Sequence, residues 1–170
     1  EDAAKLVAAR GRLMQGCQTG GAMVSVAAEE RVVREAIGTS EVSIAGLNGP
    51  KQTVISGDED AVKRVQAHFD EQGVKTTELQ VSHAFHSVHM ESMLGAFESV
   101  AEGCTFSPAR IPVVSNVTGE RATDSDLSSP SYWARQVREA VRFVDGMTTL
   151  REEGVGTYIE CGPRGVLSAM

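Results

Sequence analysis

The amino-acid sequence predicts an α/β protein in which a small βαββαβ unit interrupts a larger α/β part. Two observations predict this fold class. Over residues 20–81, strand-like and helix-like segments follow one another in the order β-α-β-β-α-β, which is the order of a ferredoxin-like split βαβ unit. After residue 82, helical and strand-like segments alternate, as they do in α/β domains. We therefore predict a ferredoxin-like subdomain at residues 20–81, inserted into a larger α/β subdomain made of residues 1–19 and 82–170.

Hydrophobic periodicity predicts each element of the first half. Apolar side chains at helical spacing predict a helix over residues 1–15. Gly38 and Gly73 each follow a helical pattern, and glycine commonly ends a helix. Asn48-Gly49-Pro50 has the composition of a turn. The small unit is predicted to contain strands at 22–28, 42–46, 52–56 and 74–81, and helices at 29–37 and 59–72.

The second half is predicted to alternate between helices and strands. A helix is expected over residues 90–101, followed by a nearly continuous apolar run at 111–117. Such a run is typical of a strand in a sheet that is covered on both faces. Beyond a polar loop at 118–130, the sequence predicts a long helical region at 132–153, a short strand at 157–160, the loop Cys161-Gly162-Pro163-Arg164-Gly165 and a last helix reaching Met170.

Charge and cysteine content exclude several function classes. The net charge of -7 argues against binding to nucleic acid or to anionic membranes. Cys17, Cys104 and Cys161 lie far apart with no Cys-x-x-Cys pair, which is typical of reduced thiols in a cytoplasmic protein. No apolar run approaches membrane-spanning length, and no signal peptide is visible. The helical pattern begins almost at residue 1 without a starting methionine, so we expect the chain to be part of a longer protein.

Three of the four histidines, His83, His86 and His89, lie close together between a predicted strand and a predicted helix. Histidine titrates nearest neutral pH, so such a cluster suggests chemistry. Three interpretations stay open: a polar loop with partly buried imidazoles, a metal site, or a general base. On one helix the three rings would fan out too widely to meet at one ion, and no carboxylate or thiolate lies at a ligand-like offset, so no metal is expected. A general base needs only one positioned imidazole.

A general base requires a nucleophile, and the sequence offers no clear one. The Gly-x-Ser-x-Gly pattern of activated serines in α/β enzymes is absent. Ser82 and Ser87 are too close to His86 in sequence to be obvious nucleophiles. Cys161 precedes Gly162-Pro163 at a possible helix N-terminus, which would lower the pKa of a thiol, but a buried thiol is the preferred interpretation.

Five motifs carry a resemblance to a known family. In order along the chain they are Leu6-Val7-Ala8-Ala9-Arg10-Gly11-Arg12-Leu13-Met14-Gln15, Asn48-Gly49-Pro50-Lys51-Gln52 before Val54-Ile55-Ser56-Gly57, His83-Ala84-Phe85-His86-Ser87, Ser115-Asn116-Val117-Thr118-Gly119 and Glu160-Cys161-Gly162-Pro163. Together they resemble the acyltransferase domain of a modular type I polyketide synthase, a relative of malonyl-CoA:acyl-carrier-protein transacylases. The resemblance covers all 170 residues, about the C-terminal two thirds of such a domain. It implies a partial α/β-hydrolase-like acyltransferase core with the ferredoxin-like insertion.

The resemblance assigns roles to individual residues. It implies that His86 is the catalytic base, that Arg10 binds the free carboxylate of the malonyl group, and that the backbone carbonyl of Gln136 accepts the other N–H of the histidine. A planar guanidinium suits the second role because it forms two parallel charge-assisted hydrogen bonds with a carboxylate. Asn48 and Asn116 lie in motifs that line the site.

The His83-Ala84-Phe85-His86 motif resembles the form associated with malonyl selection. Methylmalonyl-type domains usually read Tyr-Ala-Ser-His at this position. Phe85 is expected to crowd the pocket beside the α-carbon of the substrate and to exclude a branch methyl. Val88-His89 replaces the Pro-Leu often found after the catalytic histidine, which leaves the role of His89 open.

The resemblance also implies partners that lie outside these residues. The Gly-His-Ser-x-Gly nucleophile motif is not in this sequence, so the serine is expected in an N-terminal part of the same domain. The expected activity is the loading of a malonyl-type extender unit from malonyl-CoA, through an acyl-serine, onto the phosphopantetheine thiol of an acyl carrier protein. No bound cofactor is expected, and a neighbouring ketosynthase is implied. The 170 residues alone are expected to be inactive.

Two alternatives from other classes remain open. The chain could be a non-catalytic docking module for a carrier protein, in which the histidines are incidental. It could also belong to a related thioester hydrolase, with water as the acceptor of the acyl group. An arginine that binds the acyl carboxylate argues mildly against the hydrolase.

Overall fold

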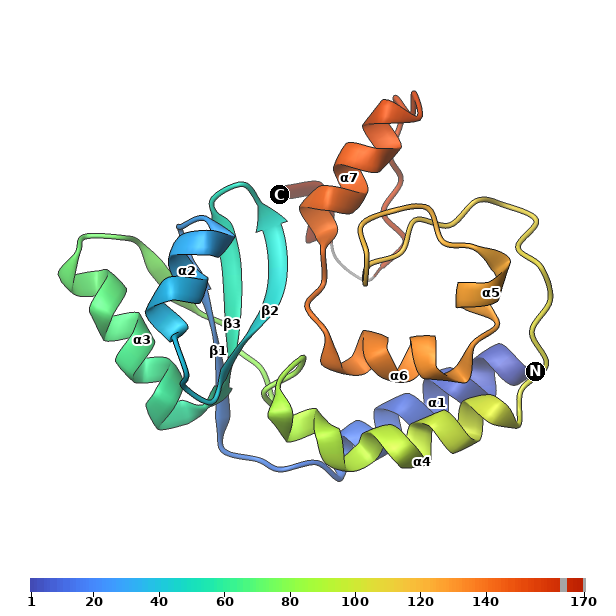
Figure 1. The fold of residues 1–170 in the computed structure, drawn as a ribbon, viewed down its shortest axis with the longest axis horizontal. Helices are drawn as coiled ribbons and strands as arrows, with labels where there is room; N and C mark the ends of the chain where they lie inside the picture. Colours follow the sequence, from blue (N-terminus) through green and yellow to red (C-terminus); the bar gives the residue numbers. More distant parts are fainter. Residues whose placement is uncertain (163–164, 170) are drawn as a thin grey trace.

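The computed structural model describes residues 1–162 and 165–169 of the chain. It has a mixed α/β fold with two parts (Figure 1). A four-stranded sheet, with two helices on one of its faces, lies beside a group of stacked helices. The chain crosses from the helices to the sheet after the first helix and returns through the loop that contains His86.

The sheet part has the predicted order of elements. It consists of β1 (Gly21–Val26), α2 (Glu30–Ile37), β2 (Val42–Gly49), β3 (Gln52–Asp58), α3 (Glu59–Glu71) and β4 (Thr76–Glu78). All neighbouring strands are antiparallel, in the spatial order β2-β3-β1-β4, so β2 is an edge strand. β4 is shorter than predicted. The predicted turn is also displaced, because Asn48 and Gly49 belong to β2 and the chain turns at Pro50 and Lys51.

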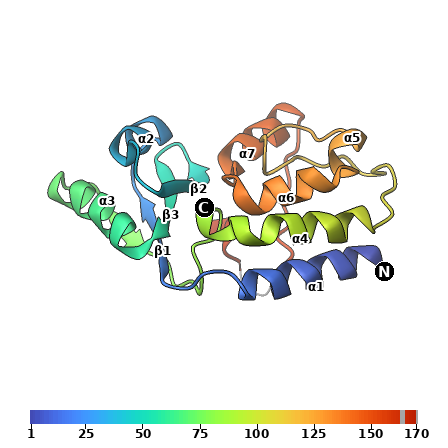
Figure 2. The same ribbon diagram turned by 60° about the horizontal axis from the view of Figure 1, so that its bottom comes forward.

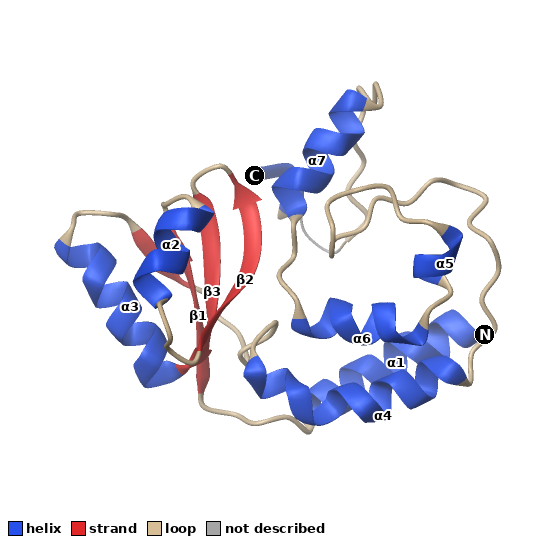
Figure 3. Ribbon diagram, in the orientation of Figure 1, coloured by secondary structure: helices blue, strands red, loops and turns tan. Residues whose placement is uncertain are grey.

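Figure 3 shows α2 and α3 on one face of the sheet. Apolar side chains of the strands and of the two helices form one buried cluster there. Val26 and Ile55 from the strands and Phe69 from α3 are fully buried in this core. The helix α3 starts at Asp58, whose carboxylate accepts the backbone N–H groups of Asp60 and Ala61. These interactions explain why this part of the sequence was predictable from its pattern alone.

The second part is mainly helical. Its elements are α1 (Asp2–Gln15), the 3₁₀ turn η1 (Val88–Met90), α4 (Glu91–Glu102), α5 (Asp124–Leu127), α6 (Pro130–Arg138), α7 (Phe143–Glu152) and the 3₁₀ turn η2 (Leu167–Ala169). Figure 2 shows α1, α4 and α6 stacked in that order. Leu6, Phe97 and Val137 come from these three helices and form part of one buried apolar cluster. This stack places α1 and α6 on either side of the segment that begins at η1.

Two predicted strands in this part are wrong within the described residues. Residues 111–117 contain only an isolated bridge between Val114 and Arg121, and residues 157–160 form no strand. A strand requires a partner for its backbone groups, and neither segment has a neighbouring sheet within the described part of the chain. Ile111 and Ile159 are 77% and 85% exposed, so these apolar side chains are not packed in the core of the described residues.

The predicted long helix at 132–153 is also wrong, because it is broken into α6 and α7. Glu139 leaves the helical conformation, with φ -80° and ψ 160°. Val141 then pairs with the edge of β2: its N–H donates to the carbonyl of Ala45 at 2.9 Å, and its carbonyl accepts from the N–H of Leu47 at 2.8 Å. An edge strand offers free N–H and C=O groups, and this tertiary pairing replaces helical hydrogen bonds.

The C-terminal prediction is only partly covered by the described residues. Pro163, Arg164 and Met170, which belong to the predicted loop and last helix, lie outside them. The carboxylate of Glu160 accepts backbone N–H groups of Leu167, Ser168 and Val166 at 2.9–3.0 Å. These hydrogen bonds lower the pKa of Glu160 to about 2.

Candidate functional site

The loop of residues 82–87 holds His86, which is partly buried, in a left-handed backbone conformation. His86 has φ 58°, and it is the one non-glycine residue with positive φ in the described part of the chain. The left-handed conformation is unfavourable for a residue with a Cβ, so surrounding contacts must maintain it. Ser87 supplies them: its buried hydroxyl donates to the carbonyl of Ala84 at 2.6 Å and accepts the N–H of His89 at 3.2 Å.

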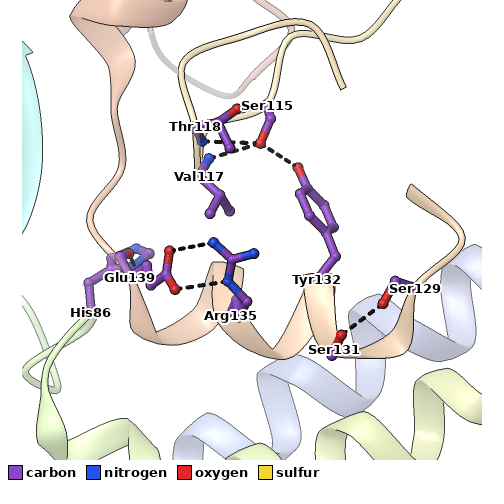
Figure 4. A network of polar contacts seen from close by, with 9 residues as sticks. All are labelled: His86, Ser115, Val117, Thr118, Ser129, Ser131, Tyr132, Arg135 and Glu139. Carbon is purple, nitrogen blue, oxygen red and sulfur yellow. Dashed lines mark hydrogen bonds and ion pairs between the residues drawn. The ribbon is translucent and has the colours of Figure 1, made fainter. Parts of the chain in front are cut away.

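The imidazole of His86 is held by a backbone carbonyl. Nδ1 of His86 lies 2.8 Å from the carbonyl oxygen of Glu139 (Figure 4). A carbonyl can only accept, so Nδ1 carries the proton and donates it, and Nε2 of the neutral ring keeps a free lone pair. Since Nε2 is then the basic nitrogen, this is the tautomer that a general base requires.

The residue predicted to supply that carbonyl, Gln136, does not do so, and this prediction is corrected to Glu139. Gln136 lies inside α6, where carbonyls point along the helix axis. Glu139 follows the last turn, and its extended ψ directs the carbonyl sideways, toward the His86 loop. Gln136 and Glu139 are three residues apart in the sequence. The position at which α6 ends determines which of their two carbonyls reaches His86.

The environment of His86 favours the neutral ring. Burial is the largest effect, and it lowers the pKa of His86 below the ordinary value of 6.5. The hydrogen bond to Glu139 opposes this, while the positive charges of Arg10 and Arg138 lower the pKa further. His86 is therefore neutral at pH 7, with its basic nitrogen available.

Arg10 reaches the same region from α1. Its charge acts on His86, although the two residues are far apart in the sequence. Its side chain is half-buried, burial lowers its pKa, and its Nε is buried without a hydrogen-bond partner among residues 1–162 and 165–169. A buried guanidinium N–H without a partner is costly, so an anionic group at this place would be favoured.

Gln136 lies beside Arg10. Both contribute to a narrow, mostly apolar crevice of about 90 Å³ between α1, α4 and α6. The residues that line it are Leu6, Val7, Arg10, Phe97, Trp133 and Gln136. The structure thus places Gln136 near the predicted carboxylate-binding residue.

Residues 139–142, here called the 139–142 segment, lie between His86 and the two asparagines that were predicted to line the site. The N–H of Arg142 donates to the carbonyl of Asn116 at 2.8 Å, while the side chain of Asn116 is exposed. Asn48 is on β2, the strand that pairs with Val141, and a Cβ added at Gly46 would lie 3.5 Å from its Oδ1. The backbone therefore brings both asparagines near the acceptor of His86, and the contacts of Asn116 with this segment are through its main chain.

A hydroxyl network supports the loop that holds Asn116 (Figure 4). The Tyr132 hydroxyl donates to Ser115 Oγ at 2.8 Å, and the same oxygen accepts the N–H groups of Val117 at 3.0 Å and Thr118 at 3.4 Å. These bonds close the Ser115–Thr118 turn, although the sequence predicted a strand there.

His83 and Phe85 lie at the junction of the two parts. His83 is buried, with Nδ1 3.0 Å from Ser82 Oγ and its ring centroid 5.9 Å from that of Phe85. Phe85 packs against the apolar cluster of the helices and also against Met23, Ala45 and Val54 of the sheet. The phenyl ring therefore fills the space between sheet and helices next to His86.

His89 is also buried at this junction, where the chain crosses between the two parts. A Cβ added at Gly21 would lie 2.5 Å from the Cβ of Ala84 and 3.0 Å from Nδ1 of His89. Only glycine fits such a close approach. His89 thus packs against the start of β1, which is a structural position.

Three further residues of the site were not predicted from the sequence: Glu139, Arg138 and Arg135. Arg138 forms an ion pair with Glu91 at 3.0 Å, and Arg135 forms one with Glu139 at 2.9 Å. All three lay within a pattern that indicated one long helix, so nothing in the local sequence distinguished them. In the portion that the structure describes, no serine or cysteine hydrogen-bonds to His86.

The described ranges contain neither a metal-binding cluster nor a membrane-spanning helix. No three His, Cys, Asp or Glu side chains come together there in a way that could hold a metal ion. Within the same ranges, none of the helices has the length and apolar character needed to cross a bilayer.

This chain is similar to a known family model and to polyketide synthases. The family model "Acyl transferase domain" matches residues 1–170. Polyketide synthase GfsA from Streptomyces halstedii is 54% identical over 172 residues, covering 99% of this chain and 2% of that protein. The Spectinabilin polyketide synthase system protein NorB from Streptomyces orinoci is 51% identical, covering 100% of this chain and 8% of that protein. The chain thus spans a small fraction of these relatives.

Solved structures agree with these matches. The acyltransferase domain from the second module of the salinomycin polyketide synthase has a TM-score of 0.94 and 50% identity, over 99% of this chain and 40% of that one. The acyltransferase domain of SpnD, solved in complex with 2-(pent-4-yn-1-yl)malonyl, has a TM-score of 0.82 and 37% identity, over 89% of this chain and 36% of that one. FabD from Acinetobacter baumannii has a TM-score of 0.90 and 32% identity, over 99% and 56% respectively.

Proposed function

The chain belongs to the acyl transferase domain family, and from this premise we propose that it supplies the base and the carboxylate-binding arginine of a malonyl-loading acyltransferase. In this proposal the enzyme transfers a malonyl-type unit from malonyl-CoA to the phosphopantetheine thiol of an acyl carrier protein during polyketide synthesis. The complex of the related SpnD domain with a substituted malonyl supports a malonyl-type substrate.

One observation above all supports this proposal: His86 is held as a neutral base, and the positive charge of the half-buried Arg10 acts on its ring. Its Nδ1–H is fixed on the Glu139 carbonyl, so Nε2 can accept a proton. The charge of Arg10 acts on the same imidazole, and Arg10 lines a crevice together with Gln136 of α6, the helix that ends at the Glu139 acceptor. A base and a guanidinium together suit a substrate that carries both an electrophilic carbonyl and a free carboxylate.

The proposed reaction has two steps. Nε2 of His86 accepts the hydroxyl proton of a serine as its oxygen attacks the thioester carbonyl, and the proton then passes to the departing thiolate of coenzyme A. In the second step His86 accepts the thiol proton of phosphopantetheine, the sulfur attacks the acyl-serine, and the proton returns to the serine oxygen. Arg10 holds the carboxylate throughout, which orients the carbonyl toward the serine.

The serine is proposed to come from an N-terminal part of the same domain, outside residues 1–170. The chain matches 40% of the salinomycin domain, which leaves room for such a part. We further infer that residues 20–81 are a ferredoxin-like subdomain and that residues 1–19 and 82–170 belong to an α/β-hydrolase-like core. The strand order β2-β3-β1-β4 supports the first assignment.

The proposed partners and substrate pocket follow from the same premise. The polyketide synthases that this chain resembles support an acyl carrier protein and a ketosynthase as neighbours. A cytoplasmic location and the lack of a bound cofactor remain parts of the proposal. Phe85, beside His83 and His86, is proposed to narrow the pocket against α-branched units. A single methyl changes selectivity only modestly, by about 10- to 200-fold. Asn48 and Asn116 are proposed to shape the site through the 139–142 segment.

The location of the covalent intermediate tests this function. When the complete acyltransferase is mixed with malonyl-CoA, mass spectrometry is expected to find a malonyl adduct on a serine outside residues 1–170. Carrier protein bearing phosphopantetheine should then remove the adduct. The 170-residue chain alone is expected to form none. An adduct on that chain alone would mean that it contains its own nucleophile, and the proposed division of roles would be wrong.

The pH dependence of transfer provides a second test. Because the base must be neutral, and because burial, Arg10 and Arg138 together lower the pKa of His86 despite the opposing hydrogen bond to Glu139, activity is expected to fall only as the pH drops below 6.5. Arg138→Ala removes one of these charges, so the pKa of His86 rises and the acidic limb of kcat/KM moves to higher pH. The shift is expected to be small, because the charge of Arg138 is the weakest of these influences on the pKa of His86 and partly solvated charges interact weakly.

Glu91→Gln is the matched control for Arg138→Ala. It breaks the same ion pair but leaves the cation of Arg138 in place. The acidic limb should therefore not move to higher pH in this variant. Equal upward shifts in the two variants would attribute the effect to the broken ion pair and not to the charge of Arg138.

A further inference from the structure

The residue that holds the His86 imidazole is itself held by an arginine. Nε of Arg135 lies 2.9 Å from Oε1 of Glu139, and Nη2 lies 3.1 Å from Oε2. This is a two-point contact between a planar guanidinium and a carboxylate, which restricts orientation more than a single bond does. Figure 4 shows it directly beside the contact between Glu139 and His86.

The position of this pair is not explained by helix stability. Glu139 follows the last residue of α6, where the partial negative charge of the helix end disfavours a carboxylate. The order of the pair, with the cation four residues before the anion, is also the less favourable one. Both side chains are about half exposed, and such pairs contribute little to folding.

The neighbouring arginines are engaged elsewhere. Arg138 pairs with Glu91 at 3.0 Å, and Arg142 pairs with Asp145 at 2.7 Å. Within residues 1–162 and 165–169, Arg135 is therefore the basic side chain that pairs with the Glu139 carboxylate.

Fixing the side chain of Glu139 also limits its backbone. Glu139 has left the helix, so the ψ angle that directs its carbonyl toward His86 is not set by helical hydrogen bonds. Its N–H is bonded to the carbonyl of Arg135 at 2.8 Å, and two residues later Val141 is bonded to β2. These two backbone contacts lie on either side of the Glu139 carbonyl. The contact between the Arg135 guanidinium and the Glu139 carboxylate is a third restraint, at the residue whose carbonyl must point toward His86.

We propose that Arg135 is a positioning residue, which acts through the Glu139 carboxylate to keep the Glu139 carbonyl on Nδ1 of His86. This inference deepens the proposed function and rests on it, since the tautomer matters only if His86 is the base. Arg135 itself touches neither His86 nor the acyl group in this proposal. Its loss lets the carbonyl turn away, so that part of the imidazole population carries its proton on Nε2, and this nitrogen then cannot accept the serine proton.

The test compares Arg135→Ala, Glu139→Ala and the double variant in the complete acyltransferase. Each single variant is expected to lower kcat for malonyl transfer about fivefold, with KM for malonyl-CoA unchanged within twofold. The double variant is expected to be no slower than either single one, because both changes remove the same contact. Nitrogen NMR of labelled histidine should show a larger fraction of the Nε2–H form of His86, assigned by comparison with His86→Gln.

Arg31→Ala is the matched control. Arg31 and Glu35 form an exposed pair with the same spacing and order on α2, away from the 139–142 segment. This variant is expected to match the parent in kcat and in the His86 spectrum, while its unfolding temperature should resemble that of Arg135→Ala.

Two results would overturn the proposal: unchanged kcat and an unchanged His86 tautomer in Arg135→Ala, or a double variant clearly slower than both single ones. Failure of the proposed function is a separate outcome. It would be seen as normal transfer in His86→Gln, whereas the tautomer of His86 in the parent and in Arg135→Ala can be read whatever the activity.

Discussion

Replacing His86 with alanine is expected to lower kcat/KM for malonyl transfer about a thousandfold, the middle of the range for loss of a general base. Without the imidazole, the serine hydroxyl has no acceptor for its proton, and the thiolate of coenzyme A has no donor. The measurement is the rate of malonyl loading onto carrier protein by the complete acyltransferase. Binding of malonyl-CoA should change little, because Arg10 remains.

His68→Ala is the control for this experiment. His68 is an exposed histidine on α3 whose Nε2 lies 2.8 Å from the side-chain nitrogen of Gln72. It should transfer at the parental rate. If His86→Ala also kept at least a tenth of the parental rate, His86 could not be the base, and the docking-module interpretation would gain support.

Replacing Arg10 with alanine is expected to lower kcat/KM for malonyl-CoA roughly 100-fold, the lower part of the range for removing one partner of a buried charge pair. The substrate carboxylate would lose its two-point contact, so both its affinity and the orientation of its carbonyl would suffer. Acetyl-CoA lacks the carboxylate, so its rate should be unchanged within a few fold. The ratio of malonyl to acetyl transfer is therefore the quantity to measure.

Two further variants on α1 sharpen this test. Arg12→Ala removes an exposed cation from the same helix and should leave the malonyl-to-acetyl ratio as in the parent. Arg10→Lys keeps the charge but not the planar fork, so it should lie between the parent and Arg10→Ala. Equal losses with malonyl-CoA and acetyl-CoA in Arg10→Ala would show that Arg10 supports the fold and does not bind the carboxylate.

The fold was predictable where local pattern and local packing agree. In α3, the buried Ala61, Val62, Val65 and Phe69 repeat at helical spacing, Asp58 caps the start, and a glycine follows the end. The same agreement holds for β1 to β3, in which β2 and β3 form a hairpin and β1 pairs with β3 inside the same small unit. Here each residue contacts its partners within one small unit, so the spacing of apolar residues in the sequence correctly predicts the local structure.

Prediction failed where a segment depends on a distant partner. The apolar run at 111–117 has the composition of a strand, yet within the described residues it has only the bridge from Val114 to Arg121. The region 132–153 has a continuous helical pattern, yet it breaks at Glu139, and Val141 pairs with β2. Helical periodicity cannot reveal that a sheet edge elsewhere offers competing hydrogen bonds.

The amino-acid sequence alone determined that a histidine in a strand-to-helix loop is a residue to examine, because its type and its histidine neighbours are local properties. Arg10 was identified only through the resemblance of its motif to a known family. Only the tertiary structure decided which carbonyl orients the imidazole. That choice depends on where α6 ends and on the pairing of Val141 with β2, contacts between residues almost one hundred positions apart. Hydrogen-bond direction is set by backbone geometry in three dimensions, and for this reason the structure identified Glu139, with Arg135 beside it, in place of Gln136.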